Sequence, residues 1–119
     1  ELEDATEHTA IIRADSRRSA YVAGIDGVDR IELSGDFSGA KSTYTYFVDI
    51  QPGAAMPVET NGSETVVWVF AGEVVSVASH KYTLATDDGA VIPAGDGYAY
   101  ANEGDGVARL VVIHPFVNR

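Results

Sequence analysis

The chain contains no cysteine among its 119 residues, so it can form neither disulfides nor thiolate metal sites. Positive charge is also scarce, because eight Lys and Arg stand against 18 Asp and Glu and give a net charge of −10. Nucleic-acid binding requires a clustered cationic surface, and this balance argues against it. No apolar run reaches the roughly 18 residues of a membrane helix, and no signal-peptide pattern opens the chain. We therefore expect a cytoplasmic protein without nucleic-acid or membrane partners.

Helical periodicity is nearly absent as well. Short segments rich in Val, Ile, Tyr, Phe and Thr recur between clusters of Gly, Asp and Asn, which is the pattern of strands and turns. Many short strands with regularly spaced turns favour a sandwich or barrel, jelly rolls included, so the sequence predicts an all-β fold. Strands are predicted near residues 8–14, 18–23, 29–34, 41–51, 57–60, 65–71, 73–79, 81–85, 90–93, 97–102 and 107–114.

The chain has the size and composition of one domain. It weighs 12.6 kDa and is 45% hydrophobic, which is enough to form a single core without covalent cross-links. No internal repeat or linker divides it. We expect residues 1–7 to form a mobile acidic lead-in and residues 8–119 to form the domain.

One apolar run predicts a partner subunit. Residues 66–71 read Val-Val-Trp-Val-Phe-Ala and do not alternate with polar residues. A strand that is apolar on both faces must be covered on both faces. The core covers one face, and we expect a second copy of the chain to cover the other in a homodimer. The alternative is that the outer face packs under the N-terminal strands.

Glycines, prolines and a few polar residues recur at set spacings in the second half of the chain. Their pattern resembles the two motifs of the cupin superfamily, G-x5-H-x-H-x3/4-E-x6-G and G-x5-P-x-G-x2-H-x3-N. This resemblance implies a cupin-type jelly-roll β-barrel or sandwich. The residues that carry it are Pro52, Gly53, Ala71, Gly72, Glu73, Ile92, Pro93, Ala94, Gly95, Tyr98 and Asn102.

The positions at which cupins hold a metal are changed in this sequence. Cupins bind Fe, Mn, Zn or Ni through the histidines and the glutamate of the two motifs, and the resemblance places Glu59, Asn61, Thr65 and Tyr98 there. A site that binds a first-row metal tightly requires imidazoles or several carboxylates, whereas these residues supply one carboxylate, an amide, a hydroxyl and a phenol. We therefore expect no metal and no other cofactor.

The same positions predict a site for a small-molecule ligand. Strand alternation places Tyr98, Tyr100 and Asn102 on one face, and the motif alignment makes that face the interior. Glu59 and Asn61 face the same cavity. An apolar pocket with a few polar groups is typical of a small-molecule site. We expect Glu59 and Tyr98 to be catalytic, and the predicted substrate-binding residues are Asn61, Thr65, Tyr100 and Asn102.

Four further residues are candidates for the pocket. His114 ends the last predicted strand and is a candidate for the pocket rim, whereas His8 and His80 are predicted to lie at the surface. Tyr44 and Tyr46 share one strand face and Asp49 takes the other, so only one of these two sets can line the pocket. The sequence leaves that choice open.

These residues favour a metal-independent isomerase, cyclase or lyase in which Glu59 acts as acid or base and a tyrosine donates to a developing oxyanion. A non-catalytic module that binds or senses a small ligand is the first alternative. The second is a metal-dependent enzyme similar to the ureidoglycine aminohydrolase-like cupins. That resemblance rests on residues 12–19 and 48–53 and on the glutamate at position 59.

Overall fold

The structure is a computed structural model that describes residues 18–20, 26–34, 43–78 and 80–115. The predicted lead-in at residues 1–7 and the predicted strand at 8–14 lie outside these ranges. So does His8.

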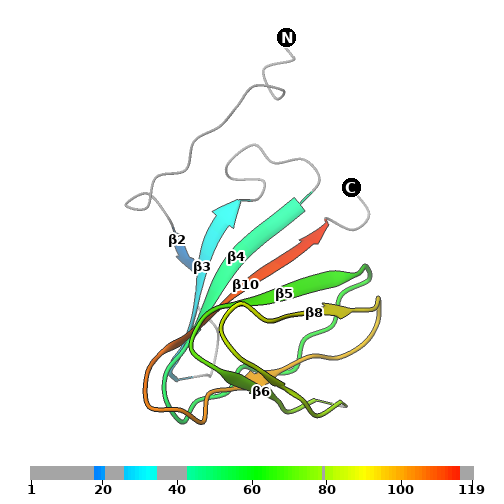
Figure 1. Ribbon diagram of the computed structural model, residues 1–119. Helices are drawn as coiled ribbons and strands as arrows, with labels where there is room; N and C mark the ends of the chain where they lie inside the picture. The colour runs from blue at the N-terminus through cyan, green and yellow to red at the C-terminus, as the bar shows by residue number, and fades with distance from the viewer. Residues whose placement is uncertain (1–17, 21–25, 35–42, 79, 116–119) are drawn as a thin grey trace.

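Antiparallel strands make up the described part of the fold (Figure 1). None of the described residues forms a helix that is long and apolar enough to cross a membrane. The strands are β2 (Arg18–Ala20), β3 (Val28–Ser34), β4 (Thr43–Ile50), β5 (Thr65–Ala71), β6 (Val74–Ser76), β7 (Thr83–Leu84), β8 (Gly89–Ile92), β9 (Tyr100–Ala101) and β10 (Ala108–Pro115).

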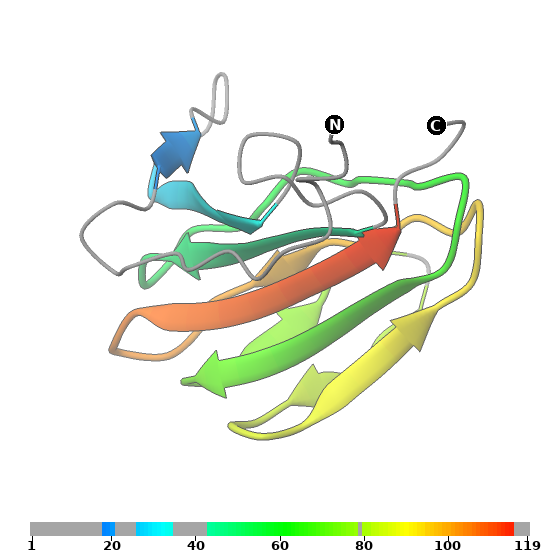
Figure 2. The same ribbon diagram turned by 90° about the horizontal axis from the view of Figure 1, so that it is seen from above.

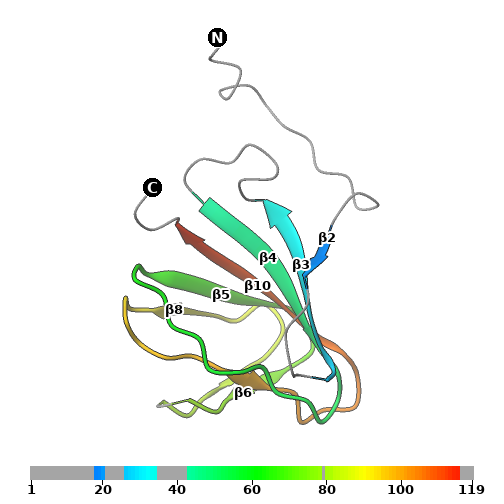
Figure 3. The ribbon, with the colours of Figure 1, turned by 180° about the vertical axis from the view of Figure 1, so that it is seen from behind.

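The strands form two sheets that face each other. The large sheet has the order β2-β3-β4-β10-β5-β8, and the small sheet has the order β7-β6-β9. Figures 1 and 3 show the small sheet opposite the β5 and β8 side of the large sheet, and Figure 2 shows β10, β5 and β8 side by side across the front. The predicted all-β jelly-roll sandwich is confirmed.

Alternating side chains build the core between the sheets. β10 lies in the middle of the large sheet, where Leu110 is paired with Val48 of β4 on one side and with Val69 of β5 on the other. All three are at most 3% exposed. On the outer face of the same strands, Arg109 donates from Nε and Nη2 to both carboxylate oxygens of Asp49, at 2.7 and 2.8 Å. The period of two thus separates an apolar interior from an outer face that is polar at this pair of strands.

The chain between β4 and β5 follows the small sheet without forming a regular strand. Only two isolated bridges are present, Ala55 to Ala101 and Glu59 to Tyr98. The strand predicted at 57–60 is therefore reduced to a single bridge. Pro57 has no N–H and cannot donate to a ladder, which explains the interruption.

The outer face of β5 is apolar, as its sequence predicts. Trp68 and Phe70 are 48% and 60% exposed, although the Phe70 ring lies 5.6 Å from that of Phe47 on β4. Val91 on the neighbouring β8 is also exposed. The homodimer that would cover this face stays a prediction.

Two glycines in tight turns permit a test of the fold. Gly53 and Gly72 have φ of +84° and +86°, and only at Gly72 would a Cβ meet other atoms, 3.0 Å from Cα of Ala108. Replacing either glycine by alanine should cost about 1–2 kcal/mol of left-handed strain. Gly72→Ala should cost roughly 1–3 kcal/mol more, because the backbone of β10 must move.

Urea unfolding followed by circular dichroism measures both losses. Gly53→Ala is the matched control, since it has the same backbone strain without the collision. Equal losses in the two variants would contradict this account of the turn after β5.

Candidate functional site

Glu59 and Tyr98, the two residues predicted to be catalytic, are paired across neighbouring segments. The N–H of Glu59 donates to the carbonyl of Tyr98 at 3.0 Å, and the N–H of Tyr98 donates back at 2.9 Å. Residues that oppose each other directly in an antiparallel pair project their side chains to the same face. Tyr98 is 2% exposed, so that face is the interior. The two side chains therefore lie next to each other between the sheets.

A guanidinium from the large sheet reaches the Glu59 carboxylate. Nη2 of Arg30 on β3 donates to Oε2 at 2.8 Å, and about a quarter of each side chain is exposed (24% and 25%). The guanidinium carbon also lies 4.2 Å from the centre of the Tyr46 ring, which is a cation–π contact. Among the described residues, no donor is bonded to the other carboxylate oxygen, Oε1. The ion pair thus joins the two sheets and leaves one oxygen free.

The Tyr98 hydroxyl accepts a hydrogen bond from the amide of Asn61. Nδ2 of Asn61 donates to it at 3.2 Å and to Oγ1 of Thr65 at 2.8 Å. A hydroxyl has two lone pairs and one proton, so Tyr98 keeps its proton for another acceptor. Its neighbours therefore leave Tyr98 free to donate to a ligand.

Burial keeps the phenols of this cluster protonated. Desolvation is the main cause of the raised pKa values of Tyr98 and Tyr46. Desolvation, together with a hydrogen bond of 2.6 Å that Tyr44 donates to Glu32, raises the pKa of Tyr44 to about 12. At neutral pH all three phenols therefore remain protonated.

The structure settles which residues of β4 face inward. Tyr44 and Tyr46 do, with ring centres 4.8 Å apart. The His114 ring lies edge-on to both, at 5.5 and 6.1 Å between ring centres. Asp49 points outward to Arg109. His114 thus lies beside the cluster, and its predicted rim role remains open.

The six predicted site residues fall into two groups. Glu59, Asn61, Thr65 and Tyr98 come together in the cluster described above. Tyr100 does not join them, because its fully buried hydroxyl pairs with that of Tyr82 at 2.6 Å.

Asn102 lies apart from the cluster. Its amide nitrogen donates to the carbonyls of Ile50 and Gly106, and its oxygen accepts from the N–H of Gly104. These bonds fasten the loop between β9 and β10 to the end of β4. The amide is therefore engaged in holding the fold.

The sequence did not point to Arg30 and Glu32 as site residues. They follow Val28 on the inward face of β3, opposite Val48 and Tyr46 of β4. Alternation alone suggests the opposite orientation, since the neighbouring Ile31 is apolar. Only the register with β4 reveals the inward charges.

A family model described as a cupin domain matches residues 46–114. The chain belongs to the cupin family. The matched range runs from β4 to β10 and contains the four clustered residues. The family resemblance of the two motifs is thereby confirmed.

Several solved structures have the same fold. The polyketide cyclase RemF from Streptomyces resistomycificus is 15% identical to this chain, with a TM-score of 0.78. The match covers 91% of this chain and 80% of the RemF chain. A sugar phosphate isomerase of the cupin superfamily from Silicibacter pomeroyi is 24% identical, with a TM-score of 0.76. The match covers 90% of this chain and 76% of the isomerase chain. TT1209 from Thermus thermophilus is 28% identical, with a TM-score of 0.66. The match covers 76% of this chain and 85% of the TT1209 chain. No curated protein sequence matches the chain significantly.

The cluster does not fit the metal that cupins hold at these positions. Glu59 is the only carboxylate among the four motif residues, and the Arg30 guanidinium is already bonded to it. A positive charge at 2.8 Å opposes a cation at the same carboxylate. The described residues contain no group of three His, Cys, Asp or Glu that could hold a metal ion. An ion pair and neutral hydrogen-bonding groups occupy this part of the cupin interior.

The raised pKa of Tyr44 predicts a loss of stability at alkaline pH. An unfolded tyrosine ionises near pH 10, whereas Tyr44 in the folded protein ionises at about 12. Between these values the unfolded chain loses a proton that the folded protein keeps, so rising pH favours unfolding. The contribution is fully present below pH 10 and is lost as the pH approaches 12.

Urea midpoints measured between about pH 9 and pH 11.5 test this expectation. Tyr44→Phe removes the titrating group, so its stability should fall less than that of the parent protein. The buried phenols of Tyr46, Tyr98 and Tyr100 remain in both proteins and serve as the common background. Parallel pH profiles would contradict the assignment.

Proposed function

We propose that this cupin binds a small organic carbonyl compound beside Glu59 and Tyr98 and moves a proton on it, as a metal-independent isomerase, cyclase or lyase. The observation that carries the proposal is the cross-strand pairing of a carboxylate with a phenol whose proton is free. A general base and a hydrogen-bond donor side by side are the groups that proton transfer next to a carbonyl requires.

The chemistry assigns each group one task. Oε1 of Glu59 takes a proton from the carbon next to the carbonyl. The electrons of that C–H bond form a C=C bond to the carbonyl carbon, and the π electrons of the carbonyl move to its oxygen. Tyr98 donates a hydrogen bond to the oxyanion that forms. The Glu59 carboxylic acid then returns the proton to a neighbouring atom, so the carboxylate is regenerated. Atoms and charge balance without an oxidant or a reductant.

The neighbouring residues hold these two groups in place. Arg30 fixes Oε2 of Glu59, which leaves Oε1 as the basic oxygen. Asn61 is positioned by Thr65 and donates to the Tyr98 hydroxyl, so the proton of Tyr98 points away from Asn61. The buried Nε of Arg30 has no hydrogen-bond partner among the described residues, so an acceptor from the ligand or a water would satisfy it. These contacts support a polar ligand at the cluster.

Two structural neighbours support the reaction class by their names, which are a polyketide cyclase and a sugar phosphate isomerase. Both names describe rearrangement of a carbon compound. At identities of 15% and 24% they share the fold with this chain.

A non-catalytic binding module is the second candidate. The observation that favours it is the Arg30–Glu59 ion pair, because a carboxylate held by a guanidinium is a fixed recognition group. In that case the same cluster would hold a ligand without changing it.

Deuterium exchange distinguishes the two candidates. The protein is incubated in D2O with 2-hydroxyacetophenone or fructose 6-phosphate, and proton NMR follows the signal of the C–H next to the carbonyl. The proposal predicts that this signal is lost faster with the protein than without it. Glu59→Gln should reduce the rate at least about 100-fold, and Tyr98→Phe should reduce it by a smaller factor.

Glu64→Gln is the matched control, because it removes an exposed carboxylate from the same loop. Its exchange rate should equal that of the parent protein. Binding of a probe to the cluster without any exchange would favour the module. Equal exchange by Glu59→Gln and its parent would contradict the catalytic role of Glu59.

A further inference from the structure

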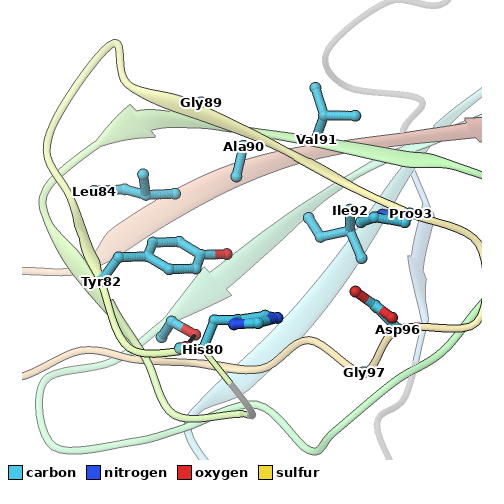
Figure 4. A pocket seen from close by; sticks show the side chains of 11 residues that line it. His80, Tyr82, Leu84, Gly89, Ala90, Val91, Ile92, Pro93, Asp96 and Gly97 are labelled. Atoms are coloured by element: carbon cyan, nitrogen blue, oxygen red, sulfur yellow. Dashed lines mark hydrogen bonds between the residues drawn. The ribbon is translucent and has the colours of Figure 1, made fainter.

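A hollow of about 370 Å³ lies between β7 and β8. These are the edge strands of the two sheets, and they are not paired with each other. None of the clustered residues around Glu59 lines this hollow. Figure 4 shows its wall, to which His80, Tyr82, Leu84, Ala90, Ile92 and Asp96 contribute.

The walls of the hollow are largely apolar. Leu84 of β7 lies on one side, and Ala90 and Ile92 of β8 lie on the other (Figure 4). The small side chain of Ala90 leaves room between the sheet edges. Cavities of at least about 300 Å³ with apolar walls and a few polar groups are typical of small-molecule sites.

Tyr82 presents a hydroxyl proton to this hollow. Its oxygen lies 2.6 Å from that of Tyr100, which is fully buried and has no other hydrogen-bond partner among the described residues. If Tyr82 were the donor, the proton of Tyr100 would remain unpaired in the core, at a large cost. Tyr100 is therefore the donor, and the proton of Tyr82 is free to bond a ligand acceptor.

His80 and Asp96 supply the other polar groups. Figure 4 shows the imidazole and the carboxylate directed toward each other across the hollow, with the Tyr82 hydroxyl facing them. Neither side chain has a hydrogen bond or ion pair within the described part of the chain. The Ser76 hydroxyl donates to the carbonyl of His80 and so holds the backbone that carries the imidazole. The polar groups thus converge on one space.

We propose that this hollow is a second binding site, and that it takes a neutral aromatic molecule with a carbonyl group and an O–H or N–H group. The apolar walls hold the ring, the Tyr82 hydroxyl donates to the carbonyl, and Asp96 accepts from the O–H or N–H group. An anion is disfavoured, because Asp96 lies at the site and the chain has a net charge of −10. This inference is independent of proton transfer at Glu59.

Titration of the 15N-labelled protein with 4-hydroxyacetophenone tests the site. This probe carries a ketone and a phenol on one ring. Amide shifts in NMR should saturate, and they should be confined to residues 76–84 and 89–97. Saturable shifts centred on Glu59 and Asn61 instead, or no saturable shifts at all, would overturn the proposal.

Variants separate the site from general surface binding. Tyr82→Phe should weaken binding about three- to tenfold, because one hydrogen bond is lost. Thr83→Val removes an exposed hydroxyl from the next residue and should leave the dissociation constant unchanged. Ala90→Phe should abolish binding by filling the hollow, and its NMR spectrum reports whether it is folded. Parent-like binding by Tyr82→Phe would overturn the assigned contact, independently of the folding of Ala90→Phe.

Discussion

The ion pair between Arg30 and Glu59 is the interaction on which the interior of this cupin depends. Arg30 belongs to the large sheet, and Glu59 lies on the segment that follows the small sheet. Removing either partner would leave a largely sheltered charge without compensation, which is more costly than losing a surface pair. The pair therefore fixes the position of the carboxylate and the distance between the sheets at this point.

Two tyrosines on one stretch of chain divide the interior into two environments. Tyr98 and Tyr100 both point inward and are at most 2% exposed. Tyr98 turns toward Asn61 and the ion pair, whereas Tyr100 turns toward Tyr82. In the cluster Tyr98 accepts a hydrogen bond from Asn61, and beside β8 Tyr82 accepts one from Tyr100. Each of these two acceptors is left with its own proton to donate. The same chemical device thus serves the cluster and the hollow beside β8.

Local patterns were sufficient to predict most of the architecture. The predicted strand at 65–71 coincides with β5, and the one at 41–51 contains β4, because runs of β-branched and aromatic residues end at turn residues. The alignment with the cupin motifs predicted that one site contains Glu59, Asn61, Thr65 and Tyr98. The strand at 57–60 was not predicted correctly, since Pro57 interrupts the ladder.

The remaining contacts depend on pairs far apart in sequence. The inward orientation of Arg30 is compensated by Glu59, which lies 29 positions away. The environment of Tyr100 depends on Tyr82, which lies 18 positions away. Period and composition describe one strand at a time, so they cannot reveal either partner. His80, which the sequence places at the surface, is indeed exposed, and it also lines a hollow that forms only because the unpaired edges of the two sheets lie opposite each other.

The central claim is that a charge pair occupies the place where other cupins hold a metal. Elemental analysis of protein purified without chelators tests it most directly. The account predicts Mn, Fe, Ni and Zn contents far below one ion per chain. One ion per chain that is lost in Glu59→Gln would contradict it, because Arg30 could not then be bonded to the same carboxylate.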